Sequence, residues 1–312
     1  MLLPISLIIF SLVVLYFAAN WLVLGGSSLA KRLGVSPLII GLTVVSFGTS
    51  APELVVSVQA SLAGQGALSI GNVVGSNFFN IGVILGISAL IYPLLVKRQL
   101  FKLDVPVMIG ATVLFLITFY DGKLTTFEAV IYLVLFVVYM IFLTIMSLRK
   151  ESPGADDVDT FKLTKHWAID ILFIVLGLGG LIFGSDLLVN NSVMVATRLG
   201  MSEALVGLTI VAAGTSMPEL ATSVVAAMKK NSDIAIGNVV GSSVFNILLI
   251  MGVAGTIKPI ETADINMIDG LYLLAFTLLL FVFMRLRRNI NRVEGALLFV
   301  IYLIYFFYKL FF

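Results

Sequence analysis

The amino-acid sequence predicts an all-α integral membrane protein. Ten transmembrane helices are expected as two inverted-topology five-helix repeats, with broken helices at the membrane midplane. Three observations support this prediction: a scarcity of charge, apolar segments of membrane-spanning length, and an internal repeat. The 312 residues are 60% hydrophobic and 12% charged, with a mean hydropathy of +1.13, whereas soluble domains average about 25% charged residues. Because so much apolar surface cannot be covered in water, the chain is expected to lie in a lipid bilayer.

The apolar segments have the length of membrane-spanning helices, which need about 20 residues to cross the hydrocarbon core. Segments of about 10 residues with alternating polarity, typical of β-barrel strands, are not the pattern here. The first segment has neither a basic start nor a small-residue cleavage site, so we expect it to be retained as a helix. The expected helices cover, to within several residues, 4–26, 36–62, 68–91, 105–120, 125–147, 168–190, 203–228, 234–257, 265–284 and 293–311.

The basic residues fall mostly on one side of this arrangement. When successive loops alternate between the two sides, one side receives 15 of the 19 Lys and Arg residues, and the other receives only Lys123, Arg198, Lys258 and Lys309. Cytoplasmic loops of membrane proteins carry an excess of Lys and Arg, so the 15-residue side is expected to be cytoplasmic. The chain is therefore predicted to be a multi-pass protein of the plasma membrane with both termini extracellular.

The composition also excludes several kinds of site. The chain has no Cys and only one His, His166, which removes disulfides, thiolate metal sites and nearly all His-based chemistry. A net charge of +2 does not indicate a nucleic-acid-binding surface. The polar stretch 148–166 is expected to be a cytoplasmic linker between the halves 1–147 and 167–312. Its acidic residues suit a solvated flexible loop or a regulatory calcium site, but they lack EF-hand spacing.

The internal repeat is the most informative feature of the sequence. Residues 17–93 align without a gap with 183–259, at an offset of 166, and 35 of the 77 positions are identical. Five expected helices separate equivalent positions, and because five is odd the copies should cross the membrane in opposite senses, as in many transporters. The densest identities lie at 41–43, 48–54 and 70–76 and at their counterparts 207–209, 214–220 and 236–242, within the segments of about 36–91 and 203–257. A duplicated structural module without transport would favour apolar identities, whereas these concentrate on polar residues, Gly and Pro.

Two glutamates, Glu53 and Glu219, are the only acidic residues in the middle of an apolar span. Each ends the motif Gly-Thr-Ser-x-Pro-Glu, which occurs at 48–53 and again at 214–219. A carboxylate at membrane depth costs several kcal/mol and is by default a sign of function. The inverted repeat is expected to bring both glutamates to one site, where two carboxylates repel unless a cation or proton lies between them.

The residues around each glutamate supply further oxygen atoms. Pro52 and Pro218 have no N–H, so the carbonyls of Gly48 and Gly214 lose their helical partners and are expected to be free. A broken helix at this depth is tolerated only where it is buried or lines a cavity. Further oxygens come from the side chains of Thr49, Ser50, Thr215 and Ser216, and from a second repeated motif that contains Ser76, Asn80, Ser242 and Asn246.

These oxygen atoms favour hard cations such as Ca²⁺ and Na⁺. Two formal negative charges match one Ca²⁺, and without it they could hold Na⁺ ions or protons. Each polar residue also has a simpler interpretation, since Ser, Thr and Gly are common where transmembrane helices pack, Asn can bond one helix to another, and Pro can simply kink a helix. Their recurrence around both glutamates favours a cation site.

The paired motifs resemble the α-repeats of the calcium/cation antiporter superfamily, and the whole chain resembles a prokaryotic sodium/calcium exchanger. The resemblance implies four cation positions at the midplane, with Ca²⁺ and Na⁺ competing for Glu53 and Glu219. It further implies oxygen ligands from Thr49, Thr215, Ser50, Ser216, Ser76, Ser242, Asn80 and Asn246, and from the carbonyls of Ser46 and Ala212.

One residue departs from a common family pattern. Many relatives have an acidic residue at the position of Asn246, including potassium-dependent ones, so this site is expected to have two carboxylates and no potassium dependence. The predicted function is exchange of Na⁺ for Ca²⁺ by alternating access, with the first and sixth helices sliding over the core. No cofactor, enzyme activity or obligate protein partner is expected. The alternatives are a Ca²⁺/H⁺ antiporter, a cation channel and, less well supported, an intramembrane hydrolase.

Overall fold

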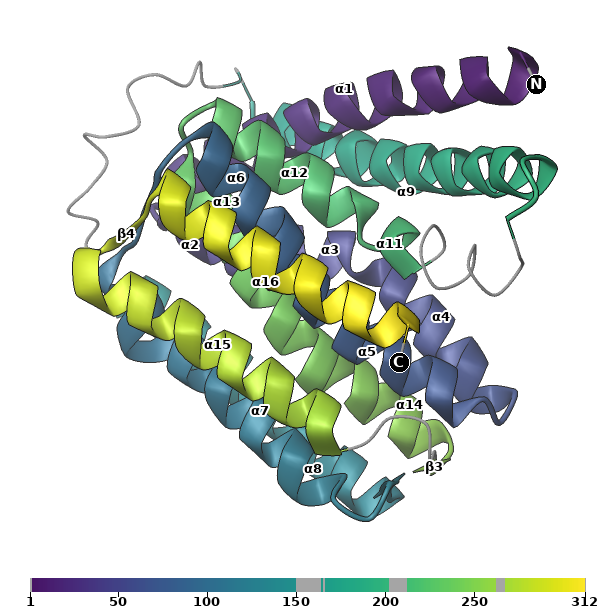
Figure 1. Ribbon diagram of the computed structural model, residues 1–312. Coiled ribbons are helices and arrows are strands. Elements are labelled where there is room, and N and C mark those ends of the chain that lie inside the picture. Colours follow the sequence, from purple (N-terminus) through teal and green to yellow (C-terminus); the bar gives the residue numbers. More distant parts are fainter. Residues whose placement is uncertain (1, 150–163, 165, 202–211, 262–266, 312) are drawn as a thin grey trace.

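The computed structural model describes residues 2–149, 164, 166–201, 212–261 and 267–311, and these residues are almost entirely helical (Figure 1). Seven of the described helices are long and apolar enough to cross a membrane, or eight when one bent pair is counted as a single span. The expected helix at 203–228 is described only in part, because residues 202–211 lie outside the described ranges. The linker residues 150–163 also lie outside them.

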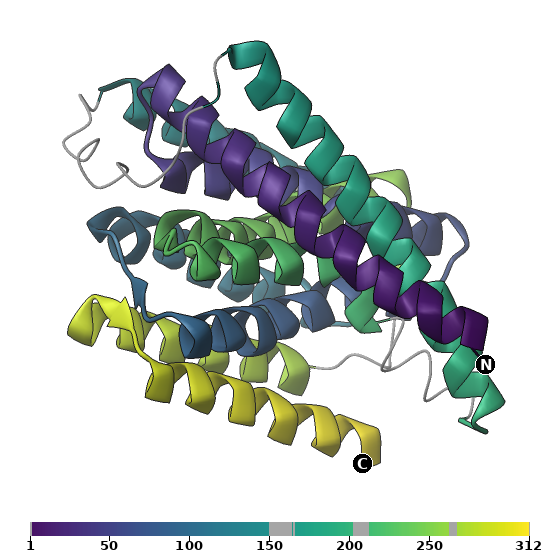
Figure 2. The same cartoon turned by 90° about the horizontal axis from the view of Figure 1, so that it is seen from above.

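The two longest helices form a pair that is set apart from the others. Helices α1 (Leu2–Leu33) and α9 (Trp167–Arg198) contain 32 residues each and pack along one another. The pair crosses obliquely over the remaining helices (Figure 2). The predicted ends at residues 26 and 190 were wrong, because α1 continues to Leu33, with Lys31 and Arg32 in its last turn, and α9 continues to Arg198.

The first glutamate-bearing span is a bent helix. It consists of α2 (Pro37–Ile40), the π-helical turn η1 (Gly41–Val45), α3 (Ser46–Thr49) and α4 (Ala51–Leu62). The axis bends by 46° between residues 49 and 51. In the second half, α11 (Ala212–Gly214) precedes α12 (Met217–Met228) in the same way. Helices α4 and α12 begin and end at positions related by the 166-residue offset.

Two further spans form the centre of the molecule. One runs through α5 (Gly66–Phe79), η2 (Asn80–Leu85) and α6 (Gly86–Ile91), and the other through α13 (Ser232–Val244), η6 (Phe245–Ile250) and α14 (Met251–Ile257). In the second of these spans, 94% of the residues in the most apolar stretch are buried, whereas 28% are buried in the most apolar stretch of α1. Both contain a π-helical segment near the middle, and π-bulges are frequent at functional sites.

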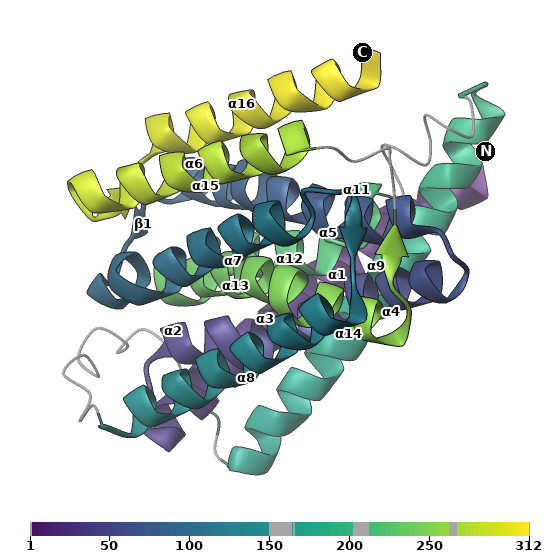
Figure 3. The same ribbon diagram turned by 90° about the horizontal axis from the view of Figure 1, so that it is seen from below.

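Peripheral helices cover this centre. Helices α15 (Met267–Arg287) and α16 (Arg292–Phe311) lie on one side with α7 (Val105–Thr118), which η3 (Leu100–Asp104) precedes, and α8 (Thr126–Arg149) lies on the other (Figure 3). Two short antiparallel pairs join loops from the two halves: β1 (Leu94–Leu95) with β4 (Asn289–Ile290), and β2 (Lys123–Leu124) with β3 (Ile260–Glu261). Loops far apart in the sequence are thereby tied together.

Close packing of α1 on α9 depends on glycine. A Cβ atom at Gly177 would lie 2.8 Å from the backbone nitrogen of Leu22 and 2.9 Å from the carbonyl oxygen of Ala18, which are too close for a real contact. At Gly179, two residues further along α9, a Cβ would meet nothing within 4 Å. The polar contacts of the pair include one where the last turn of α1 meets the first turn of α9, in which Arg32 Nε donates to Asp170 Oδ2 at 2.5 Å.

These two glycines allow a matched test of the packing. We expect Gly177→Ala to lower the thermal unfolding midpoint in detergent, because overpacking costs about 1–3 kcal/mol. Gly179→Ala should leave the midpoint unchanged or raise it, since Ala has the higher helix propensity by about 1 kcal/mol. Equal midpoints for the two variants would show that the α1–α9 contact does not require the glycine.

Candidate cation site

The two glutamates occupy equivalent places at the beginning of a helix. Glu53 is the third residue of α4 and Glu219 is the third residue of α12, and each side chain is 1% exposed. A proline is the second residue of each helix, where its missing N–H breaks no internal bond. Carboxylates near a helix N-terminus are stabilised by the helix dipole. The helix break therefore places each carboxylate where the backbone favours negative charge.

Each glutamate receives a hydroxyl from the opposite half of the chain. Ser50 Oγ donates to Glu219 Oε1 at 2.8 Å, and Ser216 Oγ donates to Glu53 Oε1 at 2.9 Å. Ser50 and Ser216 are the residues at the helix breaks, with nearly equal backbone angles of φ −83°, ψ 7° and φ −89°, ψ 9°. The structure thus brings the two repeated motifs together.

Of the two serines of the second motif, one adjoins a carboxylate and the other adjoins the serine that binds the second carboxylate. Ser242 Oγ lies 3.4 Å from Glu219 Oε1, and Ser76 Oγ lies 3.2 Å from Ser216 Oγ. Both serines are buried, with 2% of Ser76 exposed and none of Ser242. Helices α4, α5, α12 and α13 therefore all contribute a polar side chain to one buried cluster.

Among the side chains predicted as cation ligands, four buried oxygens have no hydrogen-bond partner in the described residues. They are the second carboxylate oxygens of the glutamates and the amide oxygens of two asparagines, namely Glu53 Oε2, Glu219 Oε2, Asn80 Oδ1 and Asn246 Oδ1. Buried acceptors without a donor are rare in proteins, because removing them from water is unfavourable. A set made only of acceptor oxygens, two of them from carboxylates, has the chemistry to bind a cation.

The threonines are bound to residues that the sequence analysis did not place in the site. Thr49 Oγ1 donates to Asn238 Oδ1 at 3.1 Å, and Thr215 Oγ1 lies 3.5 Å from Asn72 Oδ1. Asn238 Nδ2 in turn donates to the carbonyl of Glu219 at 3.3 Å and to Ser223 Oγ at 3.0 Å. Asn72 makes the equivalent contacts, to the carbonyl of Glu53 at 3.1 Å and to Ser57 at 2.9 Å. Both asparagines belong to a Gly-Asn pair that is identical in the two repeats. This identity could have marked them as part of the site.

One expected free carbonyl has a partner. Ser185 Oγ on α9 donates to the carbonyl oxygen of Gly214 at 2.6 Å, so the expectation that this carbonyl is free was wrong. The serine supplies a hydrogen-bond donor to this carbonyl, which lies just before the break between α11 and α12. The position equivalent to Ser185 is Ala19, which has no hydroxyl, so the carbonyl of Gly48 cannot be satisfied in the same way. The two halves of the site are therefore not identical.

The two remaining predicted ligands differ in what the structure describes. The Ser46 carbonyl accepts from Ser50 N at 3.0 Å, and the Ser46 hydroxyl donates to the carbonyl of Gly41 at 2.6 Å and lies 3.1 Å from that of Asn238. That hydroxyl therefore joins α3 to α13 and does not reach a glutamate among the contacts described. Ala212 begins α11, and its side chain lies outside the described part of the structure.

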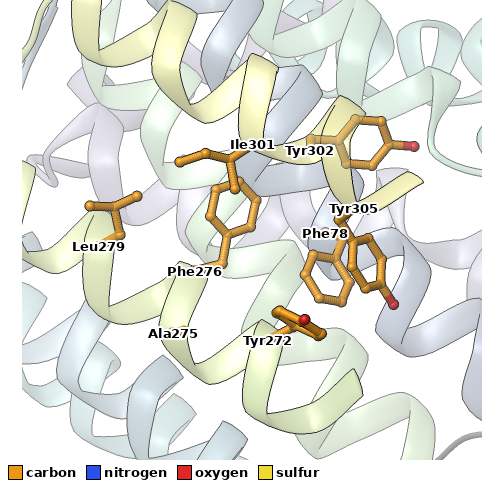
Figure 4. Close-up of a pocket in the computed structure, with 8 residues that line it drawn as sticks. All are labelled: Phe78, Tyr272, Ala275, Phe276, Leu279, Ile301, Tyr302 and Tyr305. Carbon is orange, nitrogen blue, oxygen red and sulfur yellow. The ribbon is translucent and has the colours of Figure 1, made fainter. Parts of the chain in front are cut away.

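The candidate site has two acidic side chains, and the described residues contain no larger group of metal-binding side chains. Nowhere among them do three or more His, Cys, Asp or Glu side chains gather closely enough to hold a metal ion. A cavity of about 150 Å³ lies between α5, α15 and α16 (Figure 4). It contains no acidic side chain and is lined by Phe78, Tyr272, Ala275, Phe276, Leu279, Ile301, Tyr302 and Tyr305.

Known proteins share the sequence pattern and the fold of this chain. The family model described as "Sodium/calcium exchanger protein" matches residues 3–145 and 169–311. The chain belongs to this family. It is 38% identical over 309 residues to the putative antiporter CaxA of Alkalimonas amylolytica, covering 96% of each chain, and 32% identical to the sodium/calcium exchanger MaX1 of Methanosarcina acetivorans, covering 95% of each.

Solved structures agree with this assignment. Structures of the sodium-calcium exchanger NCX_Mj superpose on the chain with a TM-score of 0.85 at 30% identity, covering 97% of both chains. The chain is therefore a multi-pass integral membrane protein of the exchanger family. The relatives described here are antiporters and exchangers by name, and none is named as an enzyme.

The asparagine network of the site can be tested by its effect on stability. Asn238→Ala removes the donor to Glu219 and Ser223 and the acceptor of Thr49, and each buried polar group left unpaired costs about 1–3 kcal/mol. We expect a clear fall in the thermal unfolding midpoint of the purified protein. Asn190→Ala, at an exposed position of α9, should not change it. Equal midpoints in both variants would contradict a supporting role for Asn238.

Proposed function

We propose that this protein is a secondary active antiporter that exchanges Na⁺ for Ca²⁺ by alternating access, with Glu53 and Glu219 as the shared cation ligands. The observation that carries this proposal is the pair of buried carboxylate oxygens, Glu53 Oε2 and Glu219 Oε2, that have no donor among the described residues. Each glutamate is held through its other oxygen by a serine of the opposite half. Two negative charges are thereby left to face a cation.

The surrounding oxygens support Ca²⁺ and Na⁺ as the transported ions. Hydroxyl, amide and carbonyl oxygens with carboxylates are the ligands of hard cations, and Ca²⁺ takes six to eight of them. The further ligands in this proposal are the side chains or carbonyls of Ser46, Thr49, Ser50, Ser76, Asn80, Ala212, Thr215, Ser216, Ser242 and Asn246. That relatives are named as sodium/calcium exchangers supports the same pair of ions.

Exchange follows from competition for the two carboxylates. Without a cation, two buried negative charges repel each other, so the passage between inward-open and outward-open states is costly. Either one Ca²⁺ or several Na⁺ neutralise the site and lower this barrier. Because both ions need the same two glutamates, they move in opposite directions on alternate passages, and a Na⁺ gradient drives Ca²⁺ transport.

The proposed architecture provides the two states. We interpret residues 1–147 and 167–312 as inverted five-helix halves, joined by the linker 148–166, with ten helices in total. The 166-residue offset between equivalent helices supports this interpretation. The α1–α9 pair, which packs together and crosses the other helices (Figure 2), is proposed to slide over the site. The distribution of Lys and Arg supports extracellular termini in a plasma-membrane protein.

Replacing either glutamate tests the site. We expect Glu53→Gln and Glu219→Gln each to lower ⁴⁵Ca²⁺ uptake into Na⁺-loaded vesicles by about 10- to 100-fold, because interactions of charged groups are worth about 1.5–3 kcal/mol. The control is Glu261→Gln, where the side chain is 63% exposed and pairs with Lys123. Normal uptake by either site variant would refute the assignment of the glutamates.

The driving ion is tested with the unmodified protein. Uptake of ⁴⁵Ca²⁺ should require Na⁺ inside the vesicles and fall to background when choline replaces it. Collapsing a pH gradient with a protonophore should have no effect, and neither should removing K⁺, because position 246 is Asn and adds no third carboxylate. Uptake driven by a pH gradient alone would instead establish a Ca²⁺/H⁺ antiporter, whereas current far above exchanger rates without a counter-ion would indicate a channel.

A further inference from the structure

Asn77 is a buried polar residue to which the proposed mechanism gives no role. It lies on α5 directly after Ser76, and its side chain is 1% exposed. Neither its Oδ1 nor its Nδ2 has a hydrogen-bond partner among the described residues. A buried amide that satisfies neither its donor nor its acceptor is unfavourable, and nearly all such groups in proteins have a partner. This residue therefore needs an explanation beyond packing.

The position of Asn77 relates it to the cation site. Residues three apart lie on the same face of a helix, so Asn77 shares a face of its span with Asn80. Helix α5, which carries Asn77, packs against η6, which carries Asn246. The amide oxygens of Asn80 and Asn246 are also buried and without a partner. Asn77 thus lies on a helix that packs against the π-helical segment carrying the asparagine of the opposite half.

The internal repeat gives a second, independent argument. At the offset of 166, Asn80 is equivalent to Asn246 and Asn77 is equivalent to Ser243. In one half-site, Asn80 Nδ2 donates to Ser243 Oγ at 3.5 Å. The equivalent pair in the other half-site is Asn246 with Asn77. There a longer side chain with one more polar atom takes the place of the serine, and its amide is left unpaired.

We propose that Asn77 is an additional cation-binding residue, whose amide oxygen is a ligand of the transported cation on the Asn246 side of the site. This inference rests on the proposed function. A neutral amide oxygen adds a ligand for Ca²⁺, which takes six to eight oxygens, without adding a third charge. The two half-sites then differ in their ligands, because Ser243 is bound to Asn80 while Asn77 is available to the cation.

A leucine at this position separates a ligand from a packing residue. Leucine has nearly the shape of asparagine but no polar atom, so removing an unpaired buried amide should preserve or raise the stability of the protein without ions. Loss of a ligand should instead weaken the response to Ca²⁺. Since a ligand that binds only the folded state raises its stability with concentration, the Ca²⁺ dependence of the thermal unfolding midpoint reports affinity independently of transport.

The experiment titrates purified wild-type protein and variants with CaCl₂ while the unfolding midpoint is measured. Without Ca²⁺, we expect the unfolding midpoint of Asn77→Leu to be at or above that of wild type. The Ca²⁺ concentration that produces half of the thermal shift should be about tenfold higher than for wild type, which is equivalent to about 1.4 kcal/mol. The same increase should appear in the half-saturating concentration of ⁴⁵Ca²⁺ uptake. Asn77→Ser, which copies the residue at position 243, should show a smaller increase and serves if the leucine variant does not fold.

The matched control is Ser88→Ala in α6. Ser88 is also fully buried with an unpartnered hydroxyl, but it lies near the end of its span, and its equivalent is Ala254. The unfolding midpoint of this variant should depend on the Ca²⁺ concentration in the same way as that of wild type. If Asn77→Leu and Asn77→Ser titrate like wild type while Glu53→Gln loses the response, the role of Asn77 is refuted and the proposed function stands. If wild type itself shows no response to Ca²⁺ and no uptake, both are refuted.

Discussion

The burial of two carboxyl groups among apolar helices is the constraint on which the rest of this structure depends. Each glutamate is 1% exposed, in a protein whose surroundings are mainly apolar. A buried charge is tolerated only with a partner of opposite charge or several hydrogen bonds. Three features position these two side chains and bind them. They are the helix breaks at Ser50 and Ser216, the prolines that follow, and the nearby hydroxyl groups. They place the carboxylates at helix N-termini and satisfy one oxygen of each.

The crossed hydrogen bonds explain why neither half would make such a site alone. Glu219 depends on Ser50 and Glu53 depends on Ser216, so each carboxylate is oriented by the other half of the chain. Thr49 and Asn238 add another contact between the halves, at 3.1 Å. A cation that binds the remaining carboxylate oxygens would therefore act on both halves together. The bond from Ser185 to Gly214 also connects the site to α9, in the outer helix pair.

Much of the site followed from sequence, because a repeated polar motif within apolar spans has few structural explanations. Glu53, Glu219 and their neighbouring serines were predicted from composition and from the offset of the repeat. The role of Asn72 and Asn238 was missed, since their partners are backbone carbonyls and serines of neighbouring helices. The ends of α1 and α9 were also misplaced, because hydropathy marks the membrane core and not the end of the helix.

The sequence by itself determined that the chain enters a membrane, that it repeats, and that two glutamates lie within its apolar spans. Each of these properties depends only on residue type and spacing. Tertiary structure alone decided which hydroxyl meets which carboxylate and which polar atoms remain unpaired, including the amide oxygen and nitrogen of Asn77. The physical reason is that a hydrogen bond acts over about 3 Å. Its partners here are more than 160 residues apart in the chain, so only the packing of helices brings them within that distance.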